Sequence, residues 1–335
     1  MRRFIRALLA MAVILAVVTG CGKGRSRVLT VYTYASFPAS LVQEIQQHFQ
    51  KEYNVRVDVK TFGDTGPMVN RLIREKSSPK ADVVIGLDNN YLFRVKKLGI
   101  LQPYRPKALP RLREELLFDP DLQLIPYDFG YIVFNYDSKT VSPVPQTHRD
   151  LLKPAYKDAI VVQSPLSSSP GQAFLLATIA LFGEDGYLEY WRGLKQNGVF
   201  VAPGWDEAYG MFTNGERAIV LSYGTSPVYH LIYEKSEQYK ALVLDGAAYA
   251  QIEGAGIVKG SPQPKLAAAL LEYLLSKDFQ EKLPEAQFMY PAVKDAKLPA
   301  SFRVAAKVDR LLNLPPEQVA AKLDRWLADW EKTMQ

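Results

Sequence analysis

The clearest chemical pattern in this chain lies in residues 221–230, Leu-Ser-Tyr-Gly-Thr-Ser-Pro-Val-Tyr-His. The pattern predicts the end of a buried strand, a tight turn and a helix that begins at Pro227 with Ser226 as its N-cap, because proline is favoured at the first helical position. Related helix starts occur at 64–67 (Asp-Thr-Gly-Pro) and 167–171 (Ser-Ser-Ser-Pro-Gly). A helix N-terminus presents free N–H groups and the positive end of a dipole. Three such starts near aromatic residues predict a site for a small ligand with a ring and an acidic or phosphorylated group.

Other residues at strand ends and helix starts could contact such a ligand. Trp205 follows Pro-Gly at a predicted loop-to-helix junction, and Tyr223 ends a predicted strand, so both rings can face a crevice. Asp64 and Thr65 offer a carboxylate and a hydroxyl at a helix start. Helix capping is the alternative role for these two residues and for the serines at 167–169, although three serines exceed what one cap requires.

Catalysis is not indicated. The sequence has no P-loop, no Gly-x-Ser-x-Gly and no Gly-x-Gly-x-x-Gly motif. Ser222 and His230 are close in sequence, but a nucleophile also needs a base that a third group holds in place. We therefore expect a binding protein and not an enzyme, and we expect His230 to have no chemical role.

The N-terminus has the layout of a secretory signal. Residues 1–20 contain three arginines and then an unbroken apolar run at 7–18, which is too short for a comfortable membrane span. The only cysteine, Cys21, stands where the signal would be cut, which resembles the lipobox of bacterial lipoproteins. We expect residues 1–20 to be a signal peptide and 21–27 a lipidated cysteine and tether, so that the protein is extracytoplasmic and lipid-anchored. An ordinary signal peptide is the alternative.

Composition excludes several classes of function. Without residues 1–20, which hold three arginines and no acidic residue, the formal charge falls from +6 to +3. No basic run has aromatic residues interleaved, so nucleic acid is not an expected partner. With Cys21 modified, no thiol remains for a disulfide, a nucleophile or a metal site, and the three histidines lack metal-binding spacing. The remaining length suits two domains, and we expect a monomer.

Hydrophobic periodicity predicts an α/β protein with two lobes. The first lobe begins as a doubly wound unit of strands and helices at 28–34, 39–51, 55–59, from 67, and 81–87. Two strand-like runs at 122–127 and 131–136 around Asp-Phe-Gly (128–130) predict a crossing into the second lobe. There we expect strands and helices at 159–163, 171–183, 186–195, 199–202, 206–213, 218–223 and from 227.

The chain is expected to return to the first lobe near 250–258 and to end in helices at 263–275, 277–283 and 315–332. Lobe 1 would comprise 28–129 and 253–335, and lobe 2 would comprise 130–252. The hinge would lie near 128–132 and 252–257, and the ligand would bind in the cleft between the lobes, at the carboxyl ends of strands.

Stretches spread over nearly the whole chain resemble the thiamine-binding, substrate-binding proteins of bacterial ABC transporters. They are 29–37 (Leu-Thr-Val-Tyr-Thr-Tyr-Ala-Ser-Phe), 81–90 (Ala-Asp-Val-Val-Ile-Gly-Leu-Asp-Asn-Asn), 126–131, 204–210, 221–230 and 289–291. The resemblance implies a type II periplasmic binding protein-like fold, a permease and an ATPase as partners, and no cofactor. Thiamine also fits the residues chemically, as other ringed ligands do, because it combines a cationic ring, a planar aminopyrimidine and a hydroxyethyl group that can be phosphorylated.

The resemblance also implies the ligand-binding residues. The residues that it places on the ligand are Asp64, Thr65, Ser168, Ser169, Trp205, Tyr223, Gly224, Thr225 and Ser226, with Tyr34, Tyr229 and Phe288 as walls for the rings. The chain departs from the family pattern at three positions: Ala35 replaces a frequent Asp, Phe288 a usual Trp, and Thr65 a frequent Gly. These departures leave open whether thiamine, its mono- or diphosphate, or a pyrimidine relative is preferred.

Three alternatives remain at this point. A ferric-iron receptor of the same fold would use adjacent tyrosines, and the sequence has no Tyr-Tyr pair. A polyamine receptor would need more carboxylates around the aromatic residues. A secreted serine hydrolase would use Ser222 or Ser226, for which the sequence shows no evident triad.

Overall fold

The computed structural model describes residues 27–335, so the predicted signal peptide and Cys21 lie outside the described residues. The first lobe begins with the predicted β-α-β-α-β unit, which is confirmed. Its elements are β1 (Val28–Tyr34), α2 (Ala39–Tyr53), β2 (Arg56–Phe62), α3 (Thr65–Arg74) and β3 (Val83–Asp88), followed by α4 (Leu92–Leu98) and β4 (Leu101–Gln102). β1 pairs in parallel with both β2 and β3. Apolar residues of α2 pack on one face of these strands, and those of α3 and α4 pack on the other.

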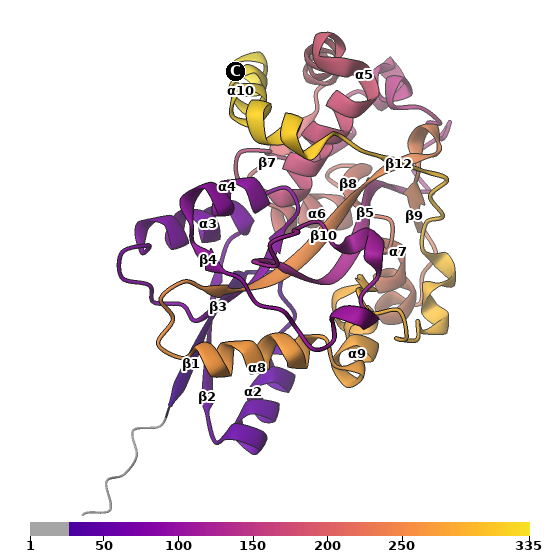
Figure 1. The fold of residues 1–335 in the computed structure, drawn as a ribbon. Helices are drawn as coiled ribbons and strands as arrows, with labels where there is room; N and C mark the ends of the chain where they lie inside the picture. The colour runs from indigo at the N-terminus through magenta and orange to yellow at the C-terminus, as the bar shows by residue number, and fades with distance from the viewer. Residues whose placement is uncertain (1–26) are drawn as a thin grey trace, which may run out of the picture.

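Two long antiparallel strands connect the lobes. They are β5 (Ile125–Asp137) and β10 (Ala247–Val258), and β10 runs through the middle of the molecule (Figure 1). The sheet order is β2-β1-β3-β10-β5-β8-β6-β7. The prediction of two separate strands around Asp128 is wrong, because Asp128, Phe129 and Gly130 all pair with β10 and continue one strand.

The second lobe contains a smaller α/β unit. Its elements are β6 (Ile160–Gln163), α5 (Ser169–Gln196), β7 (Phe200–Ala202), α6 (Trp205–Thr213), β8 (Ile219–Tyr223), α7 (Ser226–Tyr229), a π-helical turn (His230–Glu234) and β9 (Tyr239–Leu242). The two helices predicted at 171–183 and 186–195 form one element with a break at Gly183, whose φ is 71°.

The helix predicted from Pro227 differs from the expectation. It has only four residues, and Thr225 and not Ser226 is its N-cap residue. The Ser226 hydroxyl instead accepts a hydrogen bond from the Tyr223 backbone N–H at 3.3 Å and lies 2.9 Å from the Ser222 hydroxyl. So short a helix has few aligned peptide dipoles, so its start is a weaker anion site than the sequence predicted.

The C-terminal helices divide between the lobes. α8 (Pro264–Leu274) and α9 (Lys277–Gln287) pack in the core of the first lobe together with α2. The last helix, α10 (Pro316–Met334), lies beside α5 of the second lobe (Figure 1). Trp330 packs edge-on against Trp191 with ring centroids 5.5 Å apart. The assignment of all of 253–335 to the first lobe is therefore wrong for this helix, as it is for β12 (Arg310–Leu312), which pairs with the first residues of β10.

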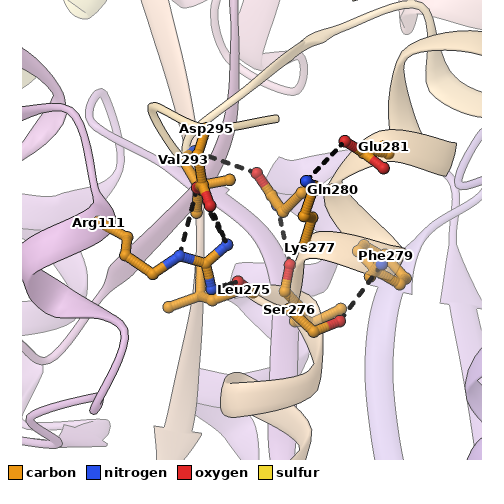
Figure 2. Close-up of polar contacts among 10 residues, drawn as sticks. Arg111, Leu275, Ser276, Lys277, Phe279, Gln280, Glu281, Val293 and Asp295 are labelled. Atoms are coloured by element: carbon orange, nitrogen blue, oxygen red, sulfur yellow. Dashed lines mark hydrogen bonds and ion pairs between the residues drawn. The ribbon is translucent and has the colours of Figure 1, made fainter. Parts of the chain in front are cut away.

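Polar contacts fix α9, whose end carries Phe288. The Ser276 hydroxyl caps the helix by accepting a hydrogen bond from the Phe279 N–H at 3.2 Å. Gln280 is fully buried, donates to the Tyr127 carbonyl at 2.7 Å and accepts from the Val293 N–H at 3.2 Å. Figure 2 shows the Gln280 side chain of α9 directed toward the segment that contains Val293. Because Tyr127 belongs to β5, these bonds tie α9 to a strand that joins the lobes.

Figure 2 also shows a bidentate ion pair beside α9. Arg111 donates to both carboxylate oxygens of Asp295, at 3.0 and 3.1 Å.

Within residues 27–335, no helix combines the length and the apolar character that a membrane crossing requires.

Candidate functional site

A cavity of about 550 Å³ is lined by residues from both lobes. Ten of the residues that the sequence predicted for the ligand line this cavity. They are Tyr34, Asp64, Thr65, Ser169, Trp205, Tyr223, Thr225, Ser226, Tyr229 and Phe288. Their segments are far apart in sequence, and the sheet and the helix starts bring them together. Their contact with a ligand stays a prediction.

Ser168 and Gly224 do not line the cavity. Ser168 is fully buried as the residue before α5. Gly224 donates its N–H to the Tyr131 carbonyl at 2.8 Å, and its carbonyl accepts from the Ala306 N–H at 2.7 Å. A Cβ at this position would lie 2.9 Å from the Ala306 Cβ. Gly224 therefore has a structural role in bringing the turn after β8 close to the segment before β12.

The Asp64 carboxylate joins helix starts from both lobes. One oxygen accepts from the Thr65 N–H at 2.6 Å, and the other accepts from the Trp205 N–H at 3.3 Å. Burial raises the pKa of Asp64, and the backbone hydrogen bonds from Thr65 and Trp205 oppose that rise. The N-termini of α3 and α6 thus already have an anionic partner within the protein, so a ligand anion would have to share or replace it.

A stack of rings forms one wall of the cavity. Trp205 and Tyr209, both on α6, stack with centroids 4.6 Å apart and planes 17° apart. The Trp205 Nε1–H donates to the Ser222 hydroxyl at 3.0 Å, and the Tyr209 hydroxyl lies 2.8 Å from His230 Nε2. The Tyr209 ring therefore supports one face of the indole, and the bond to Ser222 fixes its edge. A ring held in this way can serve as a stacking platform for a flat ligand.

Tyr229 and Phe288 form a second aromatic pair across the two lobes. Their centroids are 5.5 Å apart and their planes are nearly perpendicular, at 86°. Tyr229 lies on α7, and Phe288 adopts a left-handed conformation with φ 58° at the end of α9. Tyr229 is 37% exposed, so this pair lies at the rim of the cavity.

His230 supports this wall and does not form a catalytic group. It is fully buried, and its Nδ1 lies 2.8 Å from the Glu234 carboxylate while its Nε2 faces Tyr209. Burial lowers the pKa of His230, and Glu234 offsets part of that change. Ser222 bonds to Trp205 and Ser226, and not to this imidazole, so the arrangement lacks a Ser-His relay.

The floor of the cavity was missed by the sequence reasoning. Glu253 on β10 accepts hydrogen bonds from the hydroxyls of Tyr34 at 2.8 Å and Tyr127 at 2.7 Å. Gln251 and Gln287 also donate to it, at 3.4 and 3.3 Å. One signal for this residue was present, since Glu253 is the one charged residue in the sequence of this strand.

The ionisable carboxyl groups that line the cavity are not balanced by any basic side chain among the described residues. Asp64, Asp206, Glu234 and Glu253 contribute to the lining, and no lysine or arginine does so among the described residues. Burial raises the pKa of Asp206, and the neighbouring Glu207 adds to the rise. In the part of the chain from 27 to 335, no group of three or more His, Cys, Asp or Glu is placed to hold a metal ion. The cavity therefore favours an organic cation with a flat ring.

Comparisons with known proteins agree with this geometry. Residues 78–308 match the family described as bacterial extracellular solute-binding protein. A thiamine-binding periplasmic protein from Salmonella typhimurium is 35% identical over 313 residues, covering 92% of this chain and 93% of the relative. A solved periplasmic thiamin binding protein superposes with a TM-score of 0.85 at 33% identity, covering 94% of this chain and 98% of that one. The predicted two-lobed fold is thereby confirmed.

A more distant relative has a name that refers to a different solute. The iron uptake protein A1 of a Synechocystis species is 23% identical over 277 residues, covering 79% of this chain and 76% of the relative. Relatives of this chain are thus named for different solutes, thiamine and iron. The fold alone does not determine which ligand is bound, which depends on the side chains of the cavity.

Proposed function

Because the chain belongs to the bacterial extracellular solute-binding protein family, we propose that it is an extracytoplasmic receptor that binds thiamine, or a thiamine phosphate, and delivers it to an ABC importer. The single observation that carries the proposal is the stack of Trp205 on Tyr209 in a cavity whose charged side chains are all acidic. A stacked indole binds flat rings, and its face attracts a cationic ring most strongly. Similarity to thiamine-binding relatives over 92% of the chain supports the same ligand.

Lobe closure would couple binding to transport. The ligand would contact Asp64 and Tyr34 of the first lobe and Trp205 and Tyr229 of the second, and it would thereby favour the closed state over the open one. The permease and the ATPase would then recognise the closed receptor. The hinge would be the middle of β5 and β10, where the two strands pass between the lobes.

The test is calorimetric titration of the purified protein with thiamine, thiamine monophosphate and thiamine diphosphate. We expect saturable binding of at least one of them at micromolar levels. Mass spectrometry of ligand released from the protein as purified identifies the form that cells supply. Absence of binding by all three would contradict the proposal.

A polyamine is a second candidate, because the cavity holds four carboxyl side chains and no lysine or arginine among the described residues. Spermidine and putrescine are flexible chains that gain little from a stacked indole, whereas thiamine gains from both the rings and the charge. The same titration with spermidine distinguishes the two ligands. Tighter binding of spermidine than of thiamine would reverse the assignment.

Membrane attachment through Cys21 completes the proposal. The apolar run before this residue and the small residues beside it support cleavage and lipidation there. Labelling cells with an alkyne analogue of palmitate should mark the wild-type protein and should not mark a Cys21→Ser variant. Equal release of both proteins in soluble form would contradict a lipid anchor.

A further inference from the structure

Three acidic side chains lie in a row across the strands that connect the lobes. Glu253 of β10 is opposite Asp88 of β3 on one side and opposite Asp128 of β5 on the other. Opposite residues in antiparallel strands place their side chains on the same face, where like charges are destabilising. Asp88 and Asp128 are fully buried and Glu253 is 5% exposed, so water screens little of this repulsion.

No cationic side chain compensates this row within residues 27–335. None of the three carboxyls forms an ion pair there, and the cavity that Glu253 lines has no lysine or arginine. Burial raises the pKa of Asp88 to about 8, and Glu253 adds to the rise. Burial and Glu253 also hold the pKa of Asp128 well above its usual range. Asp88 is therefore largely protonated at pH 7, and the neutral form of Asp128 is favoured in the same direction. Neither aspartate lines the cavity, so Glu253 is the member of the row that faces a ligand.

Donors surround Glu253 and favour its charged form. The hydroxyls of Tyr34 and Tyr127 both donate to one carboxylate oxygen. Burial raises the pKa of Glu253 above its usual value, and these two hydrogen bonds oppose part of that rise. Donors that point at a carboxylate stabilise the ionised state over the protonated one. The carboxylate is thus held in place and kept available at the floor of the cavity.

Two amides beside Glu253 leave acceptors without donors. Gln251 and Gln287 direct their amide N–H groups to Glu253. Their Oε1 atoms are buried and accept no hydrogen bond from the described residues, although both residues line the cavity. Gln251 is only 2% exposed. An unsatisfied buried acceptor destabilises the protein, and a ligand that brings donors to this floor satisfies it.

We propose that Glu253 is the specificity-determining anion of the cavity, which pairs with the positive charge of a heteroaromatic ligand and rejects a neutral ring of the same shape. This inference rests on the proposed function and adds a residue to it. The aromatic wall selects flat rings in general, whereas Glu253 selects the charged ring among them. A buried carboxylate that has hydrogen-bond donors but no cationic partner is stabilised most by a ligand that supplies the cation.

The experiment compares thiamine with 3-deazathiamine, a neutral analogue in which a thiophene replaces the thiazolium ring. Affinities for both are measured by calorimetry on the purified wild type, on Glu253→Gln and on Glu216→Gln. The last variant is the matched control, because it makes the same substitution at an exposed glutamate that does not line the cavity. Circular dichroism of the unliganded variants checks that they fold.

We expect the wild type and Glu216→Gln to prefer thiamine by at least about tenfold, and Glu253→Gln to bind the two ligands within about threefold. An unchanged preference in Glu253→Gln would overturn the inference and leave the proposed function intact. Equal affinities in the wild type would overturn it as well, even if Glu253→Gln failed to fold. Failure of the wild type to bind either ligand would overturn the proposed function itself.

Discussion

The Asp64 carboxylate accepts a hydrogen bond from the backbone N–H of Trp205 at 3.3 Å and so connects the start of α3 in one lobe to the start of α6 in the other. A second bond between the lobes lies beside it, from the Gly66 N–H to the Ser167 carbonyl at 3.0 Å. These contacts bring the lobes together directly next to the aromatic wall. The contact between the lobes and the ring-binding surface therefore depend on the same short segments.

Gly66→Ala should impair closure. A Cβ at this position would lie 2.6 Å from the Ser167 carbonyl oxygen, which is backbone and cannot rotate away. Overpacking of this kind costs about 1–3 kcal/mol, and here the cost falls on the arrangement in which the two lobes are in contact. We expect the affinity for thiamine to fall by roughly tenfold, as measured by calorimetry, with a larger radius of gyration in X-ray scattering of the liganded protein.

Gly63→Ala is the matched control for this prediction. It lies three residues earlier, in the turn before α3, and a Cβ there would have no neighbour within 4 Å. Its affinity and scattering profile should equal those of the wild type. A Gly66→Ala protein that closes and binds as the wild type does would show that the contact with Ser167 does not control closure.

Stability should depend on pH through Asp88. Burial raises its pKa in the folded protein to about 8, and in the unfolded chain the pKa is near 4. Between these values the folded state holds a proton that the unfolded state has lost, so rising pH destabilises the fold through this group. Relative to Asp88→Asn, the wild type should lose up to about 1.4 kcal/mol of unfolding free energy per pH unit from pH 5 to 8, and little more above pH 8.

Urea denaturation of both proteins at pH 5, 6.5 and 8 measures this difference. Asp185→Asn is the control, because Asp185 is exposed and its loss should leave the pH dependence unchanged. A constant difference between the wild type and Asp88→Asn across the three pH values would rule out the buried protonated state.

The fold was largely predictable from the sequence because its signals are local. The apolar run of β3 and the helical spacing of α2 identify these elements without tertiary context. The break at Asp128 was predicted wrongly. Polar residues and glycine often mark the end of a strand, but here Asp128 and Gly130 pair with β10 and the strand continues. The placement of α10 was missed because an apolar helix face at Trp326 and Trp330 does not say which lobe it covers.

The site was only partly predictable for a related reason. Residues at helix starts, such as Thr65 and Ser169, carry a local signature, and the structure places them at the cavity. Tyr209 lies inside a helix and Glu253 inside a strand, where local pattern indicates burial and nothing more. Their roles depend on pairings between distant segments, such as the bond from Tyr34 to Glu253.

Phe288→Trp should strengthen ligand binding. The indole offers a larger surface and a stronger cation–π attraction than the phenyl ring, and the whole contact contributes about 0.5–1 kcal/mol at an exposed site. The gain is a part of this energy, so we expect affinity to rise by about twofold. Tyr233→Trp is the control, because Tyr233 is 64% exposed and does not line the cavity. A loss of affinity in Phe288→Trp would show that this ring limits the space for the ligand and does not stack on it.

The central claim is that the cavity between the lobes binds thiamine or its phosphates against Trp205. Its most direct test is calorimetric titration of the wild type and of Trp205→Ala with thiamine and its two phosphates, with the folding of the variant checked by thermal melting. We predict one-to-one binding of at least one of these ligands by the wild type at micromolar levels, and an affinity at least about tenfold lower for Trp205→Ala, since a desolvated cation–π contact contributes about 2 kcal/mol. No binding by the wild type, or equal binding by both proteins, would contradict the account.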